Sequence, residues 1–393
     1  MALVKLDGFL EVQEALCNPN LRQSLYEDSD ILMKDVLITL HGEEHRRRRQ
    51  SELKLFTRSV TSDYENKAFA KFLKQVVSQA VEAQDFDLVE FGYLATIQLT
   101  SDFAGVDKGR EDTDTKKLIE IVKRFSEGAT IVHSNREKNA VRENLKMAKD
   151  AFLKFLRPSW HRRKQLIQEF NKGQICEDEL PKDVLTLLLK NQASLNLDDD
   201  DIEREVCFYL QAGSHSTANS LVHAANEILN WCADTKTLAD DPTLIQKCVH
   251  ESLRLHPASP VAARRVVKKT SIAGQLLDEG DELELDLAAA NKDVTVFGKD
   301  ADIFNPMREI KNGRSQLFGL TFGAGIHLCA GRDLDGGIRS PNKRDSSVPQ
   351  FGIITQILVR LLKNGMKLDP ERNFQKETHT SRDHWKYFPV TMG

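Results

Sequence analysis

One long stretch in the middle of the chain, LNLDDDDIEREVCFYLQAGSHSTANSLVHAANEILNWC (residues 195–232), most constrains how the protein can fold. It contains no proline, and it opens with the acidic run Asp198–Asp201. Carboxylates stabilise the start of a helix because the first backbone N–H groups there have no partners. Apolar residues occur on nearly every side of such a helix, so the sequence predicts a long helix buried through the centre of a domain.

The rest of the chain changes its pattern once. From about Glu43 to Ala263, apolar residues recur at intervals of three and four, as in FAKFLKQVVSQAVE and DVLTLLLKN, which predicts several helices in series. After Pro257, the shorter runs VAARRVVKKTSIAG and DELELDLAAANKD favour strands and turns. We therefore expect a mainly α fold with a small β region.

A chain of 393 residues permits two or three average domains or one large helical domain, and we expect one large helical domain over residues 1–393. One segment interrupts it. Residues 335–350, DGGIRSPNKRDSSVPQ, are rich in glycine, serine, proline and charge, which predicts an atypical inserted loop. The following FGIITQILVRLLKNGMKL returns to a helical pattern.

Charge and cysteine content exclude several classes of protein. The formal net charge is −4, so nothing in it favours a nucleic-acid partner. Charges at Lys5, Asp7 and Glu11 interrupt the N-terminal region, so we expect neither a signal peptide nor a membrane anchor. The six cysteines have no close spacing, which argues against a disulfide framework and a structural zinc site. Together these features predict a cytoplasmic protein.

The stretch FGAGIHLCAG (residues 322–331) leaves three interpretations of Cys329: a buried structural cysteine, a zinc ligand, or a thiolate ligand of haem iron. A structural cysteine would not require the neighbouring Gly323, Gly325 and Gly331. A zinc site needs further ligands, and His327 supplies only one. The haem interpretation gives the glycines a role, because they let backbone N–H groups approach the sulfur.

The order Phe322-Gly323-x-Gly325-x-His327-x-Cys329-x-Gly331 resembles the haem-binding signature of the cytochrome P450 family, in its soluble bacterial type. The resemblance implies that haem b is held by the Cys329 thiolate, between the cysteine loop and the central long helix. It also implies that Phe322 screens the sulfur and that His327 bonds a haem propionate. Gly323 and Gly331 would then lie against the cofactor.

Two further stretches resemble propionate-binding positions of this family. His45 and Arg49 in LHGEEHRRRRQSELKLFT lie four residues apart, on one face of a helix. Arg264 occupies the place of a basic residue after the next helix, with Arg265 as a near rival. Cationic donors suit a carboxylate such as a propionate.

Another resemblance concerns the fold rather than the chemistry. Glu251 and Arg254 in ESLRLHP lie one helical turn apart and can pair. With Arg308 in FNPMRE, they resemble the family's structural pair that locks the loop beneath the haem.

The central helix carries QAGSHSTANS, which resembles the family's segment over the distal face of haem. Gly213 would leave space for dioxygen, in a helix distorted at this point. His215 stands in place of an acid, Ser216 replaces a threonine, and Thr217 follows. Hydroxyl groups and a histidine that titrates near neutral pH can relay protons, so these residues are candidate catalytic groups. For His215, a packing role stays open beside the relay role.

The resemblance also implies which residues contact the substrate, although for each of them a role in the apolar core stays open. These positions are Met33, Val36, Tyr209, Ala212, Val261 and Tyr387. Too few residues separate Leu21 from the His45 helix to form the long loop that usually covers the family's active site.

The predicted function is a haem-thiolate monooxygenase that inserts one atom of O2 into an apolar or mixed small molecule, free or carrier-bound. Electrons from NAD(P)H would come through a ferredoxin or flavodoxin and its reductase. Arg332, Arg339, Lys343 and Arg344 form either a docking patch for an acidic ferredoxin or a solvated loop. Two alternatives are a peroxide-driven peroxygenase and a haem- or ligand-binding protein without catalysis.

Overall fold

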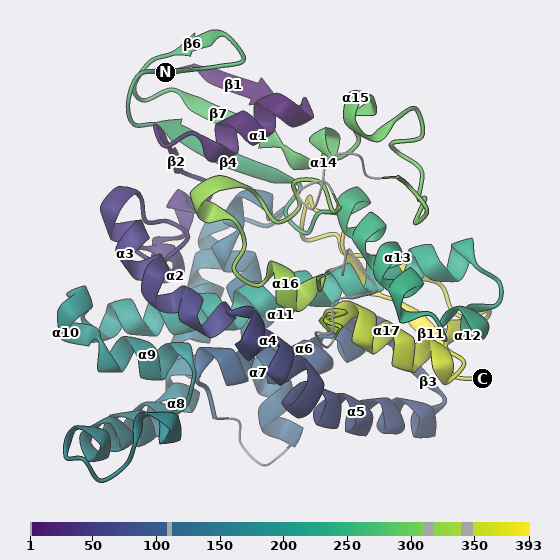
Figure 1. Ribbon diagram of the computed structural model, residues 1–393, viewed down its shortest axis with the longest axis horizontal. Coiled ribbons are helices and arrows are strands. Elements are labelled where there is room, and N and C mark those ends of the chain that lie inside the picture. The colour runs from purple at the N-terminus through teal and green to yellow at the C-terminus, as the bar shows by residue number, and fades with distance from the viewer. Residues whose placement is uncertain (1, 108–111, 310–316, 339–348) are drawn as a thin grey trace.

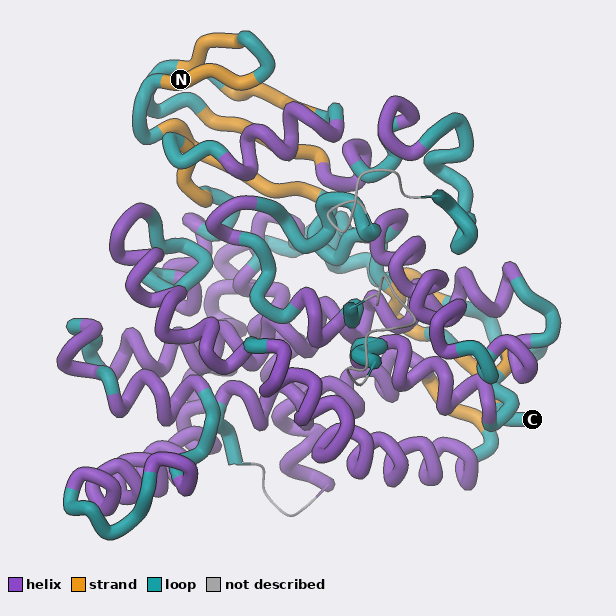
Figure 2. The backbone as a smooth tube through the Cα atoms, viewed as in Figure 1, coloured by secondary structure: helices purple, strands orange, loops and turns teal. Residues whose placement is uncertain are grey.

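The computed structural model describes residues 2–107, 112–309, 317–338 and 349–393 (Figure 1). It is mainly helical, with a small β region next to the N-terminus and further short strands near the C-terminus (Figure 2), which confirms the predicted fold class. The helices are α1 (Phe9–Cys17), α2 (Asp30–Met33), α3 (Gly42–Glu52), α4 (Arg58–Tyr64), α5 (Ala70–Ala83), α6 (Leu88–Ala104), α7 (Asp112–Ala129), α8 (Lys138–Asn171), α9 (Val184–Lys190), α10 (Gln192–Leu195), α11 (Asp199–Trp231), α12 (Thr235–Leu238), α13 (Pro242–Leu255), α14 (Leu287–Ala290), α15 (Val294–Phe297), α16 (Arg332–Asp335) and α17 (Ile353–Lys363). The strands are β1 (Leu3–Leu6), β2 (Leu21–Gln23), β3 (Asp85–Asp87), β4 (Val261–Val266), β5 (Thr270–Ile272), β6 (Gln275–Leu277), β7 (Glu282–Asp286), β8 (Lys367–Leu368), β9 (Gln375–Lys376), β10 (Trp385–Tyr387) and β11 (Pro389–Thr391).

Helix α11 is the predicted central helix, and it crosses the middle of the helical part (Figure 1). Asp198 caps its start: the Asp198 carboxylate accepts from the N–H of Asp201 at 2.8 Å, and the Asp201 carboxylate accepts from the N–H of Asp198 at 2.9 Å. These bonds satisfy backbone donors that a helix N-terminus leaves free. The predicted position and depth of this helix are confirmed.

Small residues let α6 pack closely against α11. A Cβ on Gly92 of α6 would lie 3.2 Å from the Cβ of Ala218, and a Cβ on Gly213 of α11 would lie 2.7 Å from Cγ2 of Thr100. A side chain at position 213 would therefore meet Thr100, while Gly213 itself lines the cavity in which the sequence predicts room for dioxygen. The expected distortion is not seen, because α11 is helical throughout.

The small β region is a four-stranded sheet in the order β1-β7-β4-β2, in which β1 and β7 are parallel and the other pairs antiparallel. Every second residue of β4 and β7 is buried, as expected for strands with one covered face. Helix α1 packs on this sheet and contributes Phe9 and Val12 to a hydrophobic cluster separate from the helical core. The β region thus holds the loop after α13 at one end of the helices.

The ends of the expected inserted loop lie together. Helix α16 ends at Asp335, and the N–H of Ile338 donates to the carbonyl of Gln350 at 2.7 Å. Gly337 has a left-handed φ of +75°, and a Cβ there would lie 2.3 Å from the Phe351 carbonyl carbon, so only glycine suits this crossing. The candidate docking residues Arg339, Lys343 and Arg344 lie outside the described residues.

Within the part of the chain that the structure describes, no helix combines the length and the apolar character needed to cross a membrane.

Candidate active site

A cavity of about 360 Å³ lies between α11 and the cysteine loop. Ala212, Gly213 and Ser216 of α11 form one wall, and Phe322 and Cys329 of the loop form another. This arrangement places the cysteine and the central helix on two sides of one space, as the sequence predicts for a haem site.

Backbone contacts fix the cysteine loop. The N–H of Cys329 donates to the carbonyl of Phe322 at 2.9 Å. Gly325 has a left-handed φ of +66°, and a Cβ there would lie 2.7 Å from the carbonyl oxygen of Leu16, so the glycine allows the loop to sit on the end of α1. The loop conformation therefore depends on one of the glycines singled out in the sequence.

The sulfur of Cys329 faces the cavity, which is the source of the residue's solvent exposure. Burial in the protein raises the pKa of this thiol to about 11, and the backbone N–H of Gly331 opposes the rise. Donation of this N–H favours the thiolate form, which is the form that binds a metal. The Phe322 ring packs edge-on against Phe318 at 5.0 Å, on the same side of the cavity.

Two histidines from distant segments meet at the edge of the cavity. The rings of His45 and His327 have centroids 4.5 Å apart. Their Nε2 atoms are buried and have no hydrogen-bond partner among the described residues. Burial lowers the pKa of His45 to about 4 and of His327 to about 3, so both rings are neutral.

Two arginines accompany these histidines. Arg49 donates to the carbonyl of Leu328 in the cysteine loop. Arg264 lies in the cavity wall, is 3% exposed, and has no carboxylate partner among the residues described. Unsatisfied imidazoles beside buried guanidinium groups suit the two carboxylates of a haem, so the residues present fit this cofactor.

The rival of Arg264 faces elsewhere. Arg265 pairs with Glu27 at 2.8 Å and with Glu282 at 2.6 Å. Neighbouring residues of strand β4 point to opposite faces of the sheet, which is why only Arg264 reaches the cavity.

The predicted structural triad is assembled. Arg254 lies 2.6 Å from Glu251, and Arg308 lies 3.1 Å from the same carboxylate. Arg254 also donates to the carbonyls of Asn291 and Ala301, at 2.5 and 2.6 Å. These bonds tie α13 to the chain beyond α14, away from the reacting centre.

His215 lines the cavity, within a cluster of polar side chains. Its Nδ1 is 2.5 Å from the hydroxyl of Tyr93, and its Nε2 is 3.4 Å from Nη2 of Arg382. Burial and the charge of Arg382 hold the pKa of His215 well below its usual range. The prediction that His215 titrates near neutral pH is therefore wrong: the ring is neutral.

The two hydroxyl residues after His215 face different groups. The hydroxyl of Ser216 donates to the carbonyl of Ala212 in its own helix, at 2.6 Å. Thr217 lies near Asp335. Burial raises the pKa of Asp335 to about 6, and the hydrogen bond from the Thr217 hydroxyl partly opposes this rise. Asp335 lines the cavity beside the cysteine loop, and no motif in the sequence marks it.

The substrate positions divide into two groups. Tyr209, Ala212 and Val261 line the cavity. Met33 and Val36 are wrong predictions, because they are buried in the helical core at the end of α2. The neighbouring residues Leu37 and Ile38 line the cavity instead.

Tyr387 is also a wrong prediction. It lies on β10, where its hydroxyl accepts from Arg372 at 3.4 Å, and it is not in the cavity wall. The C-terminal residue that lines the cavity is Arg382. Arg382 and Tyr26, another lining residue, stand in no recognisable motif, so sequence reasoning missed both.

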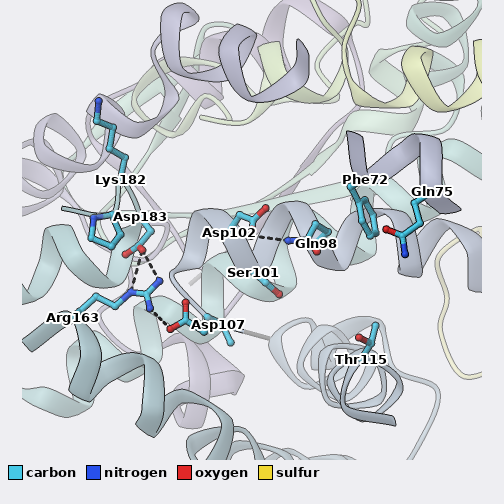
Figure 3. Close-up of a pocket in the computed structure, with 12 residues that line it drawn as sticks. Phe72, Gln75, Gln98, Ser101, Asp102, Asp107, Thr115, Arg163, Lys182 and Asp183 are labelled. Atoms are coloured by element: carbon cyan, nitrogen blue, oxygen red, sulfur yellow. Dashed lines mark hydrogen bonds and ion pairs between the residues drawn. The ribbon is translucent and has the colours of Figure 1, made fainter. Parts of the chain in front are cut away.

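A second pocket, between α5, α6, α7 and α8, shares no residue with the cavity (Figure 3). Its Arg163 pairs with Asp183 at 2.9 Å and also with Asp107. Gln98 donates to Asp102 at 2.8 Å. These polar groups satisfy one another, whereas the buried hydroxyl of Ser101 has no hydrogen-bond partner among the described residues.

Known proteins resemble this chain in sequence and in fold. The cytochrome P450 family model matches residues 232–334. Pulcherriminic acid synthase of Bacillus subtilis (strain 168) is 24% identical over 335 residues, which cover 83% of this chain and 77% of that protein. The biotin biosynthesis cytochrome P450 of the same organism is 23% identical over 310 residues, which cover 79% of this chain and 71% of that protein.

Solved structures match nearly the whole chain. P450BioI in complex with an acyl carrier protein ligated to hexadec-9Z-enoic acid has a TM-score of 0.75 at 19% identity, and the match covers 99% of this chain and 92% of that one. CalO2 has a TM-score of 0.76 at 15% identity, with 99% and 90% covered. The chain therefore has the cytochrome P450 fold, and its residues 232–334 match the cytochrome P450 family model.

Proposed function

We propose that this protein inserts one atom of O2 into an apolar or mixed small organic molecule, with haem held by the thiolate of Cys329. The observation that carries the proposal is that the sulfur of Cys329 faces a cavity closed on another side by α11. When bound there, haem supplies the activation of dioxygen. The protein supplies the ligand, the orientation and the protons.

The residues around Cys329 have separate duties in this proposal. The N–H of Gly331 donates toward the sulfur, and Phe322, which lines the same cavity, would screen one side of it. His45, Arg49, Arg264 and His327 would hold the propionates, as the unsatisfied imidazoles and the unpaired guanidinium of Arg264 support. Glu251, Arg254 and Arg308 maintain the fold below the site.

The contacts of His215 determine which ring nitrogen carries its proton. The guanidinium of Arg382 can only donate, so Nε2 of the neutral ring accepts from it. Nδ1 then carries the proton and donates to the hydroxyl oxygen of Tyr93. In this proposal, His215 passes protons as a neutral ring, with Ser216 nearer the reacting centre.

The electron source is part of the proposal. Electrons from NAD(P)H would arrive through a ferredoxin or flavodoxin and its reductase, since the chain offers no motif of a flavin or iron–sulfur domain. The substrate is a small molecule, free or carrier-bound; a carrier is supported by the likeness to P450BioI, whose structure contains an acyl carrier protein.

The test of the proposal is an absorption spectrum of the reduced, carbon monoxide-bound protein. We expect the red-shifted Soret band of a thiolate ligand, lost in Cys329→Ser and kept in the matched control Cys176→Ser, which changes an exposed cysteine. A histidine-type band in the unchanged protein would contradict the proposal. Oxygen consumption that depends on reductant and ferredoxin then tests catalysis.

The same assay separates the two alternatives. Turnover with hydrogen peroxide and no reductant would indicate a peroxygenase. A thiolate spectrum without reductant-dependent oxygen consumption, in the presence of several ferredoxins and flavodoxins, would indicate a binding protein without catalysis.

A further inference from the structure

An arginine without a carboxylate partner, Arg382, lies in the wall of the cavity. It comes from the segment between β9 and β10, and its Nη2 atom lies 3.4 Å from Nε2 of His215. Its Nε atom lies 3.4 Å from the hydroxyl of Thr380. Both contacts are long and both partners are neutral, so neither balances the charge. Among the residues that the structure describes, no carboxylate forms an ion pair with Arg382.

Elsewhere in the described chain, deeply buried arginines are paired. Four arginines outside the cavity wall are less than a tenth exposed, and every one of them contacts a carboxylate. The pairs are Arg48 with Glu52 and Glu205, Arg163 with Asp107 and Asp183, Arg204 with Asp200 and Asp201, and Arg254 with Glu251. Pairing is expected, because a buried charge without a partner lowers stability. Arg382 is partly exposed rather than deeply buried, because it faces the cavity, and its guanidinium lies without a carboxylate partner at a place that a ligand can reach.

The groups around Arg382 carry no negative charge. His133 and His384 feel its charge, and burial holds the pKa of His133 at about 4 and that of His384 well below its usual range, so both rings are neutral. Tyr26 and Tyr93 also lie near it, and burial raises the pKa of each phenol. An anion that enters the cavity would therefore meet the guanidinium of Arg382 among neutral histidine and tyrosine side chains.

We assign the haem propionates to a different group. Arg49 donates to the carbonyl of Leu328 in the cysteine loop, and burial, together with the charges of Arg264 and Arg49, lowers the pKa of His327 in that loop. Arg382 instead contacts His215, and burial together with the charge of Arg382 lowers the pKa values of His133, His215 and His384. Because Tyr26 lies near both Arg264 and Arg382, the haem content of the Arg382 variants is part of the test below.

We propose that Arg382 binds a carboxylate of the substrate, so that the substrate is an apolar carboxylic acid. This inference rests on the proposed function, because the ligand is a substrate only if the protein is the proposed monooxygenase. The hydrocarbon part would lie against the apolar wall, which includes Leu25, Ile38 and Val261. The hydroxyl of Ser126, which also lines the cavity, is a further donor for the acid group.

The test is a binding titration of the haem-loaded protein, which requires no turnover. Decanoate and hydrocinnamate are compared with decanamide and hydrocinnamamide, which have the same shape and no charge. Binding is measured by calorimetry, with the Soret shift as a second readout. The variants are Arg382→Gln, Arg382→Lys and, as a matched control outside the cavity, Arg265→Gln, whose side chain pairs with Glu27 and Glu282.

We expect at least one acid to bind at least tenfold more tightly than its amide, and Arg382→Gln to remove this preference without changing amide binding or haem content. Arg382→Lys, which keeps the charge, should retain part of the preference. Equal binding of every acid and its amide would overturn the inference. Loss of haem from Arg382→Gln would instead assign Arg382 to a propionate, and an equal loss of acid and amide binding would show a structural role.

Failure of the proposed function would look different. If the thiolate spectrum is absent but acids still bind more tightly than amides by calorimetry, the proposed function fails and the binding of a carboxylate by Arg382 stands. If the thiolate spectrum is present but acids and amides bind equally, only the inference about Arg382 fails.

Discussion

The side chain of Arg308 lies 3.1 Å from the carboxylate of Glu251, which the structure buries in α13. Arg308 also lies 2.7 Å from Asp300 and donates to the carbonyl of Phe297 at 2.5 Å. One guanidinium therefore ties the segment after α15 to the helix that carries Glu251. Since Arg254 holds the same carboxylate, Glu251 is the shared partner of two cations.

The substitution Glu251→Gln should strongly destabilise the fold. It leaves two guanidinium groups with a neutral partner, and breaking a buried ion pair on one side costs about 3–5 kcal/mol. Urea unfolding of the haem-loaded protein measures the free energy of unfolding. As a control, Glu284→Gln removes one partner of the exposed pair with Lys5 and should leave stability nearly unchanged. Equal effects of the two substitutions would contradict the prediction.

Two neighbouring arginines should differ in their effect on haem retention. Arg264→Gln removes a cation from the cavity wall, so we expect haem transfer to apomyoglobin to become about tenfold faster, the equivalent of one charge-assisted hydrogen bond. Arg265→Gln removes a cation that pairs with Glu27 and Glu282 away from the cavity, and haem transfer should stay at its original rate. If Arg265→Gln had the larger effect, the assignment of Arg264 to a propionate would be wrong.

Gly213→Ala should destabilise the contact between α6 and α11. The added Cβ would lie 2.7 Å from Cγ2 of Thr100, and overpacking of this kind costs about 1–3 kcal/mol, more than the gain of about 1 kcal/mol in helix propensity. Thr100→Ser removes Cγ2 and keeps the hydroxyl that lies 2.6 Å from Ser214. In the Thr100→Ser background, Gly213→Ala should therefore become neutral or stabilising. A double-mutant cycle in urea measures the coupling, and additive effects would refute this account.

Stability should fall as the pH falls from about 6.5 to about 4, in part because of His133. Burial lowers the pKa of His133 from 6.5 to about 4, so within this window the unfolded chain binds more protons than the folded one. Unfolding is therefore favoured at lower pH, by on the order of 1–3 kcal/mol for this site. His133→Leu should flatten the dependence of the urea midpoint on pH. His161→Leu, at an exposed histidine, should leave the slope unchanged.

His215→Ala should increase the release of hydrogen peroxide per NAD(P)H severalfold at the expense of product. The substitution removes the ring that lies between Tyr93 and Arg382, and so interrupts the proposed path for protons. Tyr93→Phe removes only the hydroxyl that accepts from His215 and should have a smaller effect in the same direction. Unchanged coupling of reductant use to product in His215→Ala would leave His215 with a packing role.

Local patterns in the sequence predict much of this protein. The caps and apolar residues of α11 lie within one continuous segment, and the pair Glu251 and Arg254 lies within one helical turn, so their spacing alone brings them together. The glycine loop around Cys329 is also continuous. Such features depend on backbone geometry over a few residues, which a pattern of residue types can encode.

Tertiary packing decides which groups meet across the cavity and in what charge state. Arg382 reaches His215 because a C-terminal turn folds back over α11, and no spacing in the sequence brings these residues together. Burial, which depends on the whole fold, makes His215 neutral and raises the pKa of Asp335 to about 6. The sequence by itself therefore determined the central helix, the ligand loop and the local ion pair. Only the tertiary structure decided which arginines face the cavity unpaired, because that depends on contacts between segments far apart in the chain.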